Sequence, residues 1–63
     1  MCLSTIYSGK EINDEKILCE YVTEIEINEY NLKVIDITGN MTEYNGIINK
    51  IDLIRNSIFI DLD

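Results

Sequence analysis

The chain has 63 residues, of which 46% are hydrophobic, and its twelve carboxylates against five lysine and arginine side chains give a formal net charge of −7. This length allows one small domain, residues 1–63, with a marginal core, and two cysteines are too few for the disulfide framework of a small secreted protein. The lysine and arginine side chains are scattered singly along the chain, which argues against nucleic-acid binding. No stretch is long and apolar enough for a membrane helix, so we expect a soluble, cytoplasmic domain.

The first half of the chain is rich in β-branched residues and short alternating runs, which are typical of strands. The first strand is expected over residues 2–8. Residues 14–20 begin with polar side chains and continue with apolar ones at helical spacing, which favours one short helical turn. Residues 22–27 end in a strict alternation of polar and apolar side chains, and residues 32–38 read as the partner strand of a hairpin.

The second half of the chain is expected to add three more strands. Residues 39–40 are Gly-Asn, which tolerates positive φ and predicts a tight two-residue turn into a short strand over 41–44. Asn-Gly at 45–46 is expected to break or bend that strand, and 47–54 reads as the next strand. A turn then leads to the last strand, 57–62.

Five or six short antiparallel strands in a chain of this length favour an all-β fold, a bent and partly closed barrel of the SH3-like or Sm-like type. Several strands carry apolar residues on both faces, more than so small a barrel can bury. Such a surplus is typical of an interface, so we expect a two-fold homodimer. The predicted core consists of Ile6, Leu18, Ile25, Ile27, Ile35, Ile37, Ile51, Leu53, Ile58 and Ile60.

The order of these segments resembles a known family. A cysteine at position 2 opens the first strand, followed by Val-Thr-Glu-Ile-Glu-Ile at 22–27, a Leu-x-Val-x-Asp-Ile-Thr-Gly segment at 32–39, and Gly-x-Ile-x-x-Ile-Asp-Leu at 46–53. Ile-Phe-Ile at 58–60 completes the pattern. Over nearly its whole length the chain resembles the CooT family of nickel-binding accessory proteins, which is tied to maturation of carbon monoxide dehydrogenase and whose relatives are often labelled predicted RNA-binding proteins.

The resemblance implies a small-barrel homodimer that binds one Ni(II) at its interface through the two Cys2 thiolates. The chemistry of the residues is compatible with this, because a chain without histidine offers thiolates, carboxylates, the N-terminal amine and backbone amides as ligands. If Met1 is retained, the N-terminal amine, the deprotonated Cys2 amide and the Cys2 thiolate can form two fused five-membered chelate rings around a metal ion. If Met1 is removed, the amine and thiolate of Cys2 can form one such ring. Soft sulfur suits late transition metals. Two chains at a two-fold axis supply two sulfurs and two nitrogens.

The structural interpretation of the same residues is simpler. Cys2 then packs as a small hydrophobe, and Cys19, which follows Leu18 in an apolar stretch, belongs to the core. Carboxylates such as Asp36 and Asp52 occupy solvated strand faces rather than a hard-oxygen cation site, because no EF-hand spacing is present.

Three functions follow from these observations. The first is the one that the resemblance implies, a nickel carrier or metallochaperone with Cys2 as its metal ligand. We expect it to be non-catalytic, because the chain has no histidine, no phosphate-cradling loop and no nucleophile with a recognisable base. An RNA-binding small barrel is the first alternative, and the charge of −7 opposes it. The second alternative is a protein-interaction module that uses a sheet edge or an apolar patch.

Overall fold

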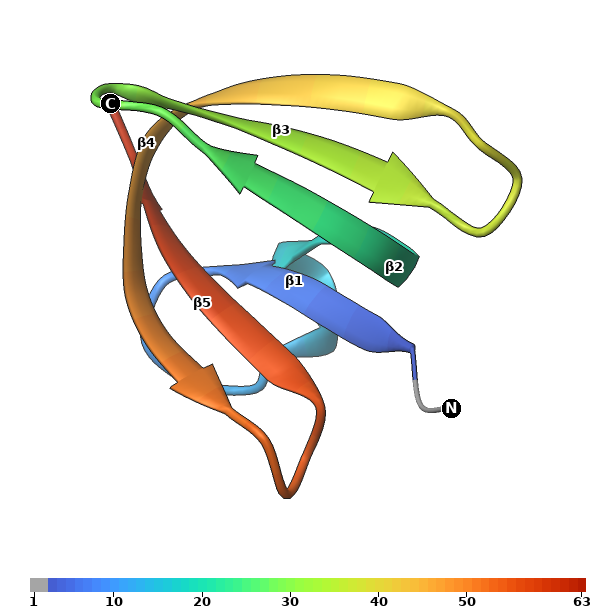
Figure 1. Cartoon of the computed structure of the whole chain (residues 1–63). Helices are drawn as coiled ribbons and strands as arrows, with labels where there is room; N and C mark the ends of the chain where they lie inside the picture. Colours follow the sequence, from blue (N-terminus) through green and yellow to red (C-terminus); the bar gives the residue numbers. More distant parts are fainter. Residues whose placement is uncertain (1–2) are drawn as a thin grey trace.

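The computed structural model describes residues 3–63, which fold into a closed barrel of five strands (Figure 1). The predicted small all-β barrel is therefore confirmed. No helix in this part of the chain has the length and apolar character needed to cross a membrane. In chain order the elements are β1 (Ser4–Ser8), the 3-10 turn η1 (Asp14–Lys16), β2 (Ile17–Ile27), β3 (Asn31–Asp36), β4 (Met41–Asp52) and β5 (Ser57–Leu62).

The ring closes through a pair of parallel strands. Each strand pairs antiparallel with the next one along the chain, whereas β1 and β5 run in the same direction, with Ile6 beside Ile58 and Tyr7 beside Phe59. The sequence predicted antiparallel strands throughout. An odd number of strands that alternate in direction must place two parallel neighbours where the ring closes, so the difference follows from the count of five.

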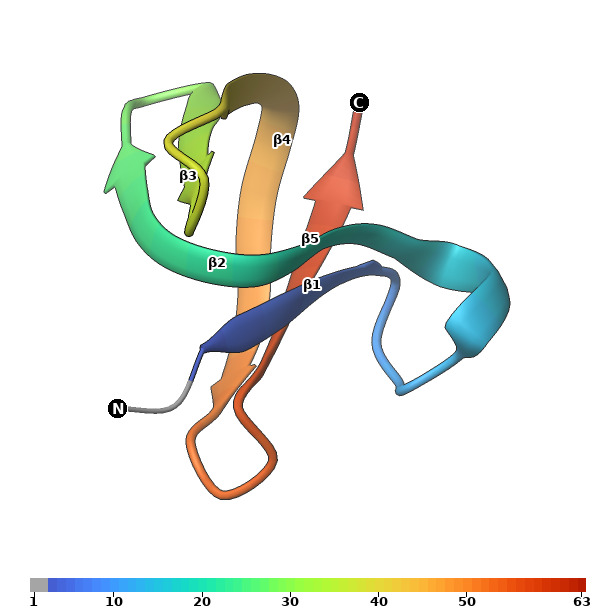
Figure 2. The same cartoon turned by 90° about the vertical axis from the view of Figure 1, so that its right-hand side faces the viewer.

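The long, bent strand β2 pairs with two neighbouring strands. It pairs with β1 through its first half and with β3 through its second half, and Figure 2 shows the strand curving across the molecule. Tyr21 lies in the left-handed region at φ 57°, just before a register shift between Val22 and Glu24. This irregularity redirects the strand from one neighbour to the other.

The predicted helical turn is confirmed over a shorter range. It covers Asp14–Lys16, where the Asn13 side chain accepts a hydrogen bond of 3.0 Å from the Glu15 N–H. Ile17 and Cys19, which we expected to lie in the turn, belong to β2. They pair with β1, and this ladder outweighs a helical spacing that extends over only a few residues.

The second half of the chain differs from the expected pattern at three points, one of which is that the strand predicted to end at residue 54 ends at Asp52. Residues 41–52 form one continuous strand, bent but unbroken, because Gly46 lets β5 pass close to its backbone. The turn before it spans residues 37–40 rather than two residues. In that turn the Asp36 carboxylate accepts hydrogen bonds from the Thr38 N–H at 2.9 Å and hydroxyl at 2.6 Å, and from the Asn40 N–H at 3.2 Å.

The barrel interior holds a core that matches the prediction only in part. Ile27, Ile37, Ile51 and Leu53, all predicted to be buried, are 65%, 60%, 51% and 82% exposed. Ile27 and Ile51 lie opposite buried residues, but near the ends of their strands. Leu53 lies in a turn, and Ile37 follows β3. The buried hydrophobic residues are Ile6, Tyr7, Val22, Leu32, Val34, Ile58, Phe59 and Ile60.

Candidate metal centre

The predicted metal ligand Cys2 lies outside the described residues, but the strand that follows it is well anchored. Leu3 and Ser4 are partly buried and lead into β1. The Thr5 N–H donates a hydrogen bond of 2.9 Å to the Asn56 carbonyl, and Thr5 lies beside Ser57 in the parallel pair. The β4–β5 turn therefore fixes the start of β1.

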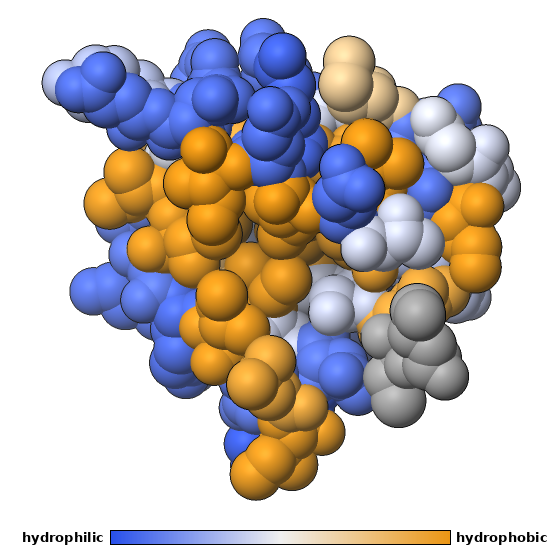
Figure 3. Space-filling model, in the orientation of Figure 1, coloured by the Kyte–Doolittle hydropathy of each residue, from blue (hydrophilic) through white to orange (hydrophobic). Residues whose placement is uncertain are grey.

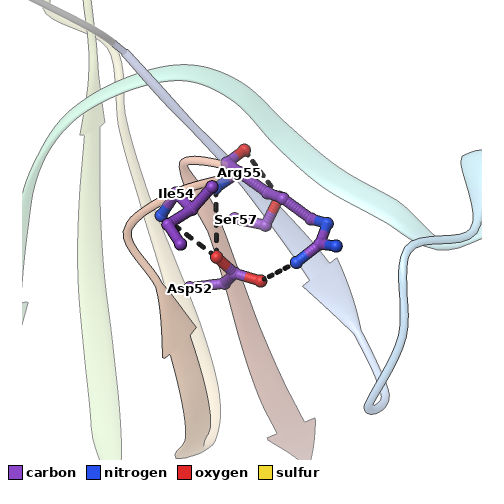
Figure 4. Close-up of polar contacts among 4 residues, drawn as sticks. All are labelled: Asp52, Ile54, Arg55 and Ser57. Atoms are coloured by element: carbon purple, nitrogen blue, oxygen red, sulfur yellow. Dashed lines mark hydrogen bonds and ion pairs between the residues drawn. The ribbon is translucent and has the colours of Figure 1, made fainter.

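That turn is organised by one carboxylate (Figure 4). Asp52 Oδ1 accepts hydrogen bonds from the Ile54 N–H at 3.1 Å and the Arg55 N–H at 3.0 Å, while Asp52 Oδ2 accepts from Arg55 Nη1 at 2.9 Å. The Ser57 hydroxyl donates to the Arg55 carbonyl at 3.0 Å, and Asn56 has a left-handed backbone at φ 50°. Asp52 thus shapes the turn that presents the Asn56 carbonyl to β1.

This function of Asp52 was not predicted from the sequence. The segment around Asp52 carried part of the family resemblance, and a turn at residues 55–56 was expected. The signal that was available is an aspartate just before a turn, because its short carboxylate reaches backbone N–H groups two or three residues further on.

Asp52 makes the stability of the barrel depend on pH. Hydrogen bonds from the Arg55 backbone and side chain lower the pKa of Asp52 below its usual 3.8. A lowered folded-state pKa means that the contribution is complete above the unfolded-state value and is lost as the pH falls through the folded-state value. We expect Asp52→Asn to lower the melting temperature by roughly 5 °C at pH 6.

Thermal unfolding followed by circular dichroism checks this prediction at pH 6 and at successively lower pH. The difference in melting temperature between the two proteins should shrink as the pH falls through the lowered pKa of Asp52, because the native carboxyl then becomes neutral as well. A difference that stays the same over the whole series would show that lost geometry, and not lost charge, explains the effect.

Cys19 packs against the barrel core. It lies opposite Ile6 in the β1–β2 pair, is partly buried, and its thiol makes a weak contact of 3.7 Å with the Glu20 carbonyl. Burial, followed by the charges of Asp36 and Glu20, raises the pKa of this thiol. The packing of Cys19 agrees with the prediction that this residue belongs to the core.

The carboxylates of the described chain are spread out. Asp36 and Asp52 each close a different turn, and Glu24 and Glu26 are exposed on β2. Within residues 3–63 no group of three or more cysteine, aspartate or glutamate side chains is placed to hold a metal ion.

An apolar surface lies beside the anchored start of β1. Ile51, Leu53 and Ile54, which we call the hairpin tip, are 51%, 82% and 91% exposed. Figure 3 shows that apolar side chains gather on one face of the molecule and continue down to the protruding β4–β5 turn. The predicted surplus of apolar side chains is therefore present on the surface.

Fold and site together define a small all-β barrel protein whose first strand is preceded by a cysteine. Residues 1–61 match the sequence profile of the family described as CO dehydrogenase accessory protein CooT, and the chain belongs to this family. No curated protein matches the chain significantly.

Proposed function

We propose that the protein is a non-catalytic accessory protein that carries nickel for the maturation of carbon monoxide dehydrogenase. In this proposal one Ni(II) cargo ion binds between two copies of the chain through their Cys2 thiolates. Membership of the CooT family carries the proposal, because this family is defined as accessory to carbon monoxide dehydrogenase. We also propose a cytoplasmic location, where thiols remain reduced.

The distribution of soft ligands supports Cys2 as the ligand. The chain has two cysteines and no histidine, and Cys19 is packed against the core with a raised pKa. Cys2 is then the remaining source of thiolate, the ligand that favours late transition metals. Because the thiolate binds metal, nickel binding should release protons and weaken as the pH falls.

The position of the hairpin tip supports a homodimer. A protein of charge −7 repels a second copy through its acidic surface, whereas the hairpin tip presents three large apolar side chains. The β4–β5 turn is bonded to β1 three residues after Cys2. A two-fold axis near this turn would therefore bring two chain starts close together.

We expect Ile54→Asp to weaken the homodimer about thirtyfold or more, because a central apolar side chain of an interface contributes about 2 kcal/mol. Ile54 is 91% exposed, so the barrel itself should remain folded. Analytical ultracentrifugation over a range of concentrations gives the dimer dissociation constant. Ile47→Asp adds the same charge at a 56% exposed position opposite Asp61 and serves as the control. Equal weakening by both variants would show a general charge effect and remove the hairpin tip from the interface.

Titration of the reduced protein with Ni²⁺ tests the function directly. We expect a thiolate-to-nickel absorption band that saturates at one metal ion per two chains. Competition with Cu²⁺, Co²⁺ and Zn²⁺ in a calorimeter then measures the preference among these metals. A salt-dependent shift of RNA without any response to metal would instead support the RNA-binding alternative.

A further inference from the structure

Two adjoining hollows lie where the loop after β1 meets β4, β5 and the turn between them. They have volumes of about 350 Å³ and about 180 Å³, and Lys10 and Lys50 line both. Arg55 lines the smaller hollow as well. Three of the five cationic side chains of this acidic chain therefore surround one depression, which we call the lysine groove.

Phe59 lines the smaller hollow and contacts one of these cations. Phe59 is 2% exposed and stacks on Tyr7 with 5.5 Å between ring centroids. The ammonium of Lys50 lies 4.7 Å from the centroid of Phe59. A cation over the face of a packed ring is held by the ring's negative potential, so the contact with Phe59 restricts where the Lys50 ammonium lies.

The second lysine is carried by a loop whose first residue is hydrogen-bonded to two strands of the barrel. Lys10 follows Gly9, whose N–H donates to the Ile60 carbonyl at 2.9 Å. The Gly9 carbonyl in turn accepts a hydrogen bond of 3.3 Å from the Asn49 side chain. Segments forty residues apart in the sequence thereby bring two lysines to the same depression.

The two lysines form no ion pair within the described part of the chain. The only ion pair among residues 3–63 joins Arg55 to Asp52, and that carboxylate is also occupied by backbone N–H groups. Two carboxylates also line the smaller hollow, namely Asp52, which pairs with Arg55, and Glu11, which forms no ion pair there. In a chain with twelve carboxylates, two positioned lysines without an ion pair are available to an external anion.

We propose that the lysine groove binds a short acidic segment of a partner protein. The hollows are open to solvent, whereas sites for small ligands enclose most of the ligand surface. An extended peptide fits an open groove, and Ile12, which is 48% exposed at the rim, offers an apolar contact to a residue beside a carboxylate. The chain's charge of −7 repels long acidic tracts, so recognition is confined to a few residues.

The test uses the whole protein labelled with ¹⁵N and the peptide acetyl-Glu-Leu-Glu-Leu-Glu-amide as the probe. We expect saturable NMR shifts at residues 10–12, 49–55 and 59, and no such shifts with the peptide in which glutamine replaces each glutamate. The double variant Lys10→Gln, Lys50→Gln should bind about fivefold more weakly, as the loss of two exposed ion pairs predicts.

The matched control is the double variant Lys16→Gln, Lys33→Gln, which removes the same charge elsewhere and should bind like the native protein. Equal weakening by both double variants would show a general charge effect and overturn the proposal. Absence of saturable shifts, or shifts at these residues with an oligonucleotide and not with the peptide, would overturn it too. Both variants leave Cys2 and the hairpin tip unchanged, so nickel binding and dimerisation provide an independent check that the proteins are intact.

Discussion

Replacing Cys2 by serine is expected to lower the affinity for Ni(II) at least about a hundredfold, because even residues that only support metal ligands change affinity by 10- to 100-fold. A serine hydroxyl stays protonated and is a much harder donor than a thiolate. The thiolate-to-nickel absorption band should disappear, while circular dichroism should still show the β-barrel. Calorimetric titration of the two proteins with Ni²⁺ gives the ratio of dissociation constants.

Cys19→Ser is the matched control, since it removes the other thiol of the chain. We expect the nickel band to remain at full amplitude, because Cys19 packs against the barrel core opposite Ile6 and its pKa is raised. Loss of the band in Cys19→Ser together with its retention in Cys2→Ser would show that Cys19, and not Cys2, is the metal ligand. Retention of tight binding in both single variants would show that neither thiol is essential.

The fold class was predictable because the strands carry a strong local signal. Alternation at the end of the segment 22–27 and turn residues near 39–40 indicate hairpins without any tertiary information. The length of β4 was not predictable in the same way. Asn-Gly at residues 45–46 normally punctuates a strand, but here the missing side chain of Gly46 admits the neighbouring strand.

Which face of a strand is buried was harder to predict than where the strand lies. In and just after β3 the chain offers Leu32 and Val34 for one face and Ile35 and Ile37 for the other, and both sets are apolar. A shift of one residue exchanges the two faces. The register with β2 and β4 places Leu32 and Val34 in the core, at 1% exposure each. Hydrophobicity alone could not make that choice.

One part of the candidate site could be predicted from the local sequence, whereas the contacts around it depend on residues that are far apart in the chain. Cys2 was predicted to be the metal ligand because its position, the absence of histidine and the family resemblance all indicate it, and this stays a prediction because Cys2 lies outside the described residues. The bond from Thr5 to Asn56 and the convergence of Lys10 with Lys50 depend on how the ring closes. These contacts join segments 40 or more residues apart and have no short-range signal.

Replacing Gly46 by alanine is expected to destabilise the barrel by about 3 kcal/mol, the upper part of the usual range for overpacking. A Cβ at this position would collide with the carbonyl oxygen of Asp61 and would crowd the Leu62 backbone. Both neighbours are backbone atoms of β5, which pairs with β4 and β1, so neither moves without disturbing two ladders. Domains of this size have total stabilities of only about 3–9 kcal/mol. Urea unfolding followed by circular dichroism measures the loss.

Gly39→Ala is the control variant that distinguishes the strain of a left-handed backbone from a steric clash with a neighbouring strand. Gly39 lies at φ 88° with open space around its Cα, so alanine there meets only the strain of a left-handed backbone, about 1–2 kcal/mol. Gly46 is not among the glycines with positive φ, and its requirement for glycine comes from the strand that passes over it. If Gly46→Ala lowers the free energy of unfolding no more than Gly39→Ala does, β5 can move away from β4. The closed ring is then less tightly constrained than the close contact between these two strands implies.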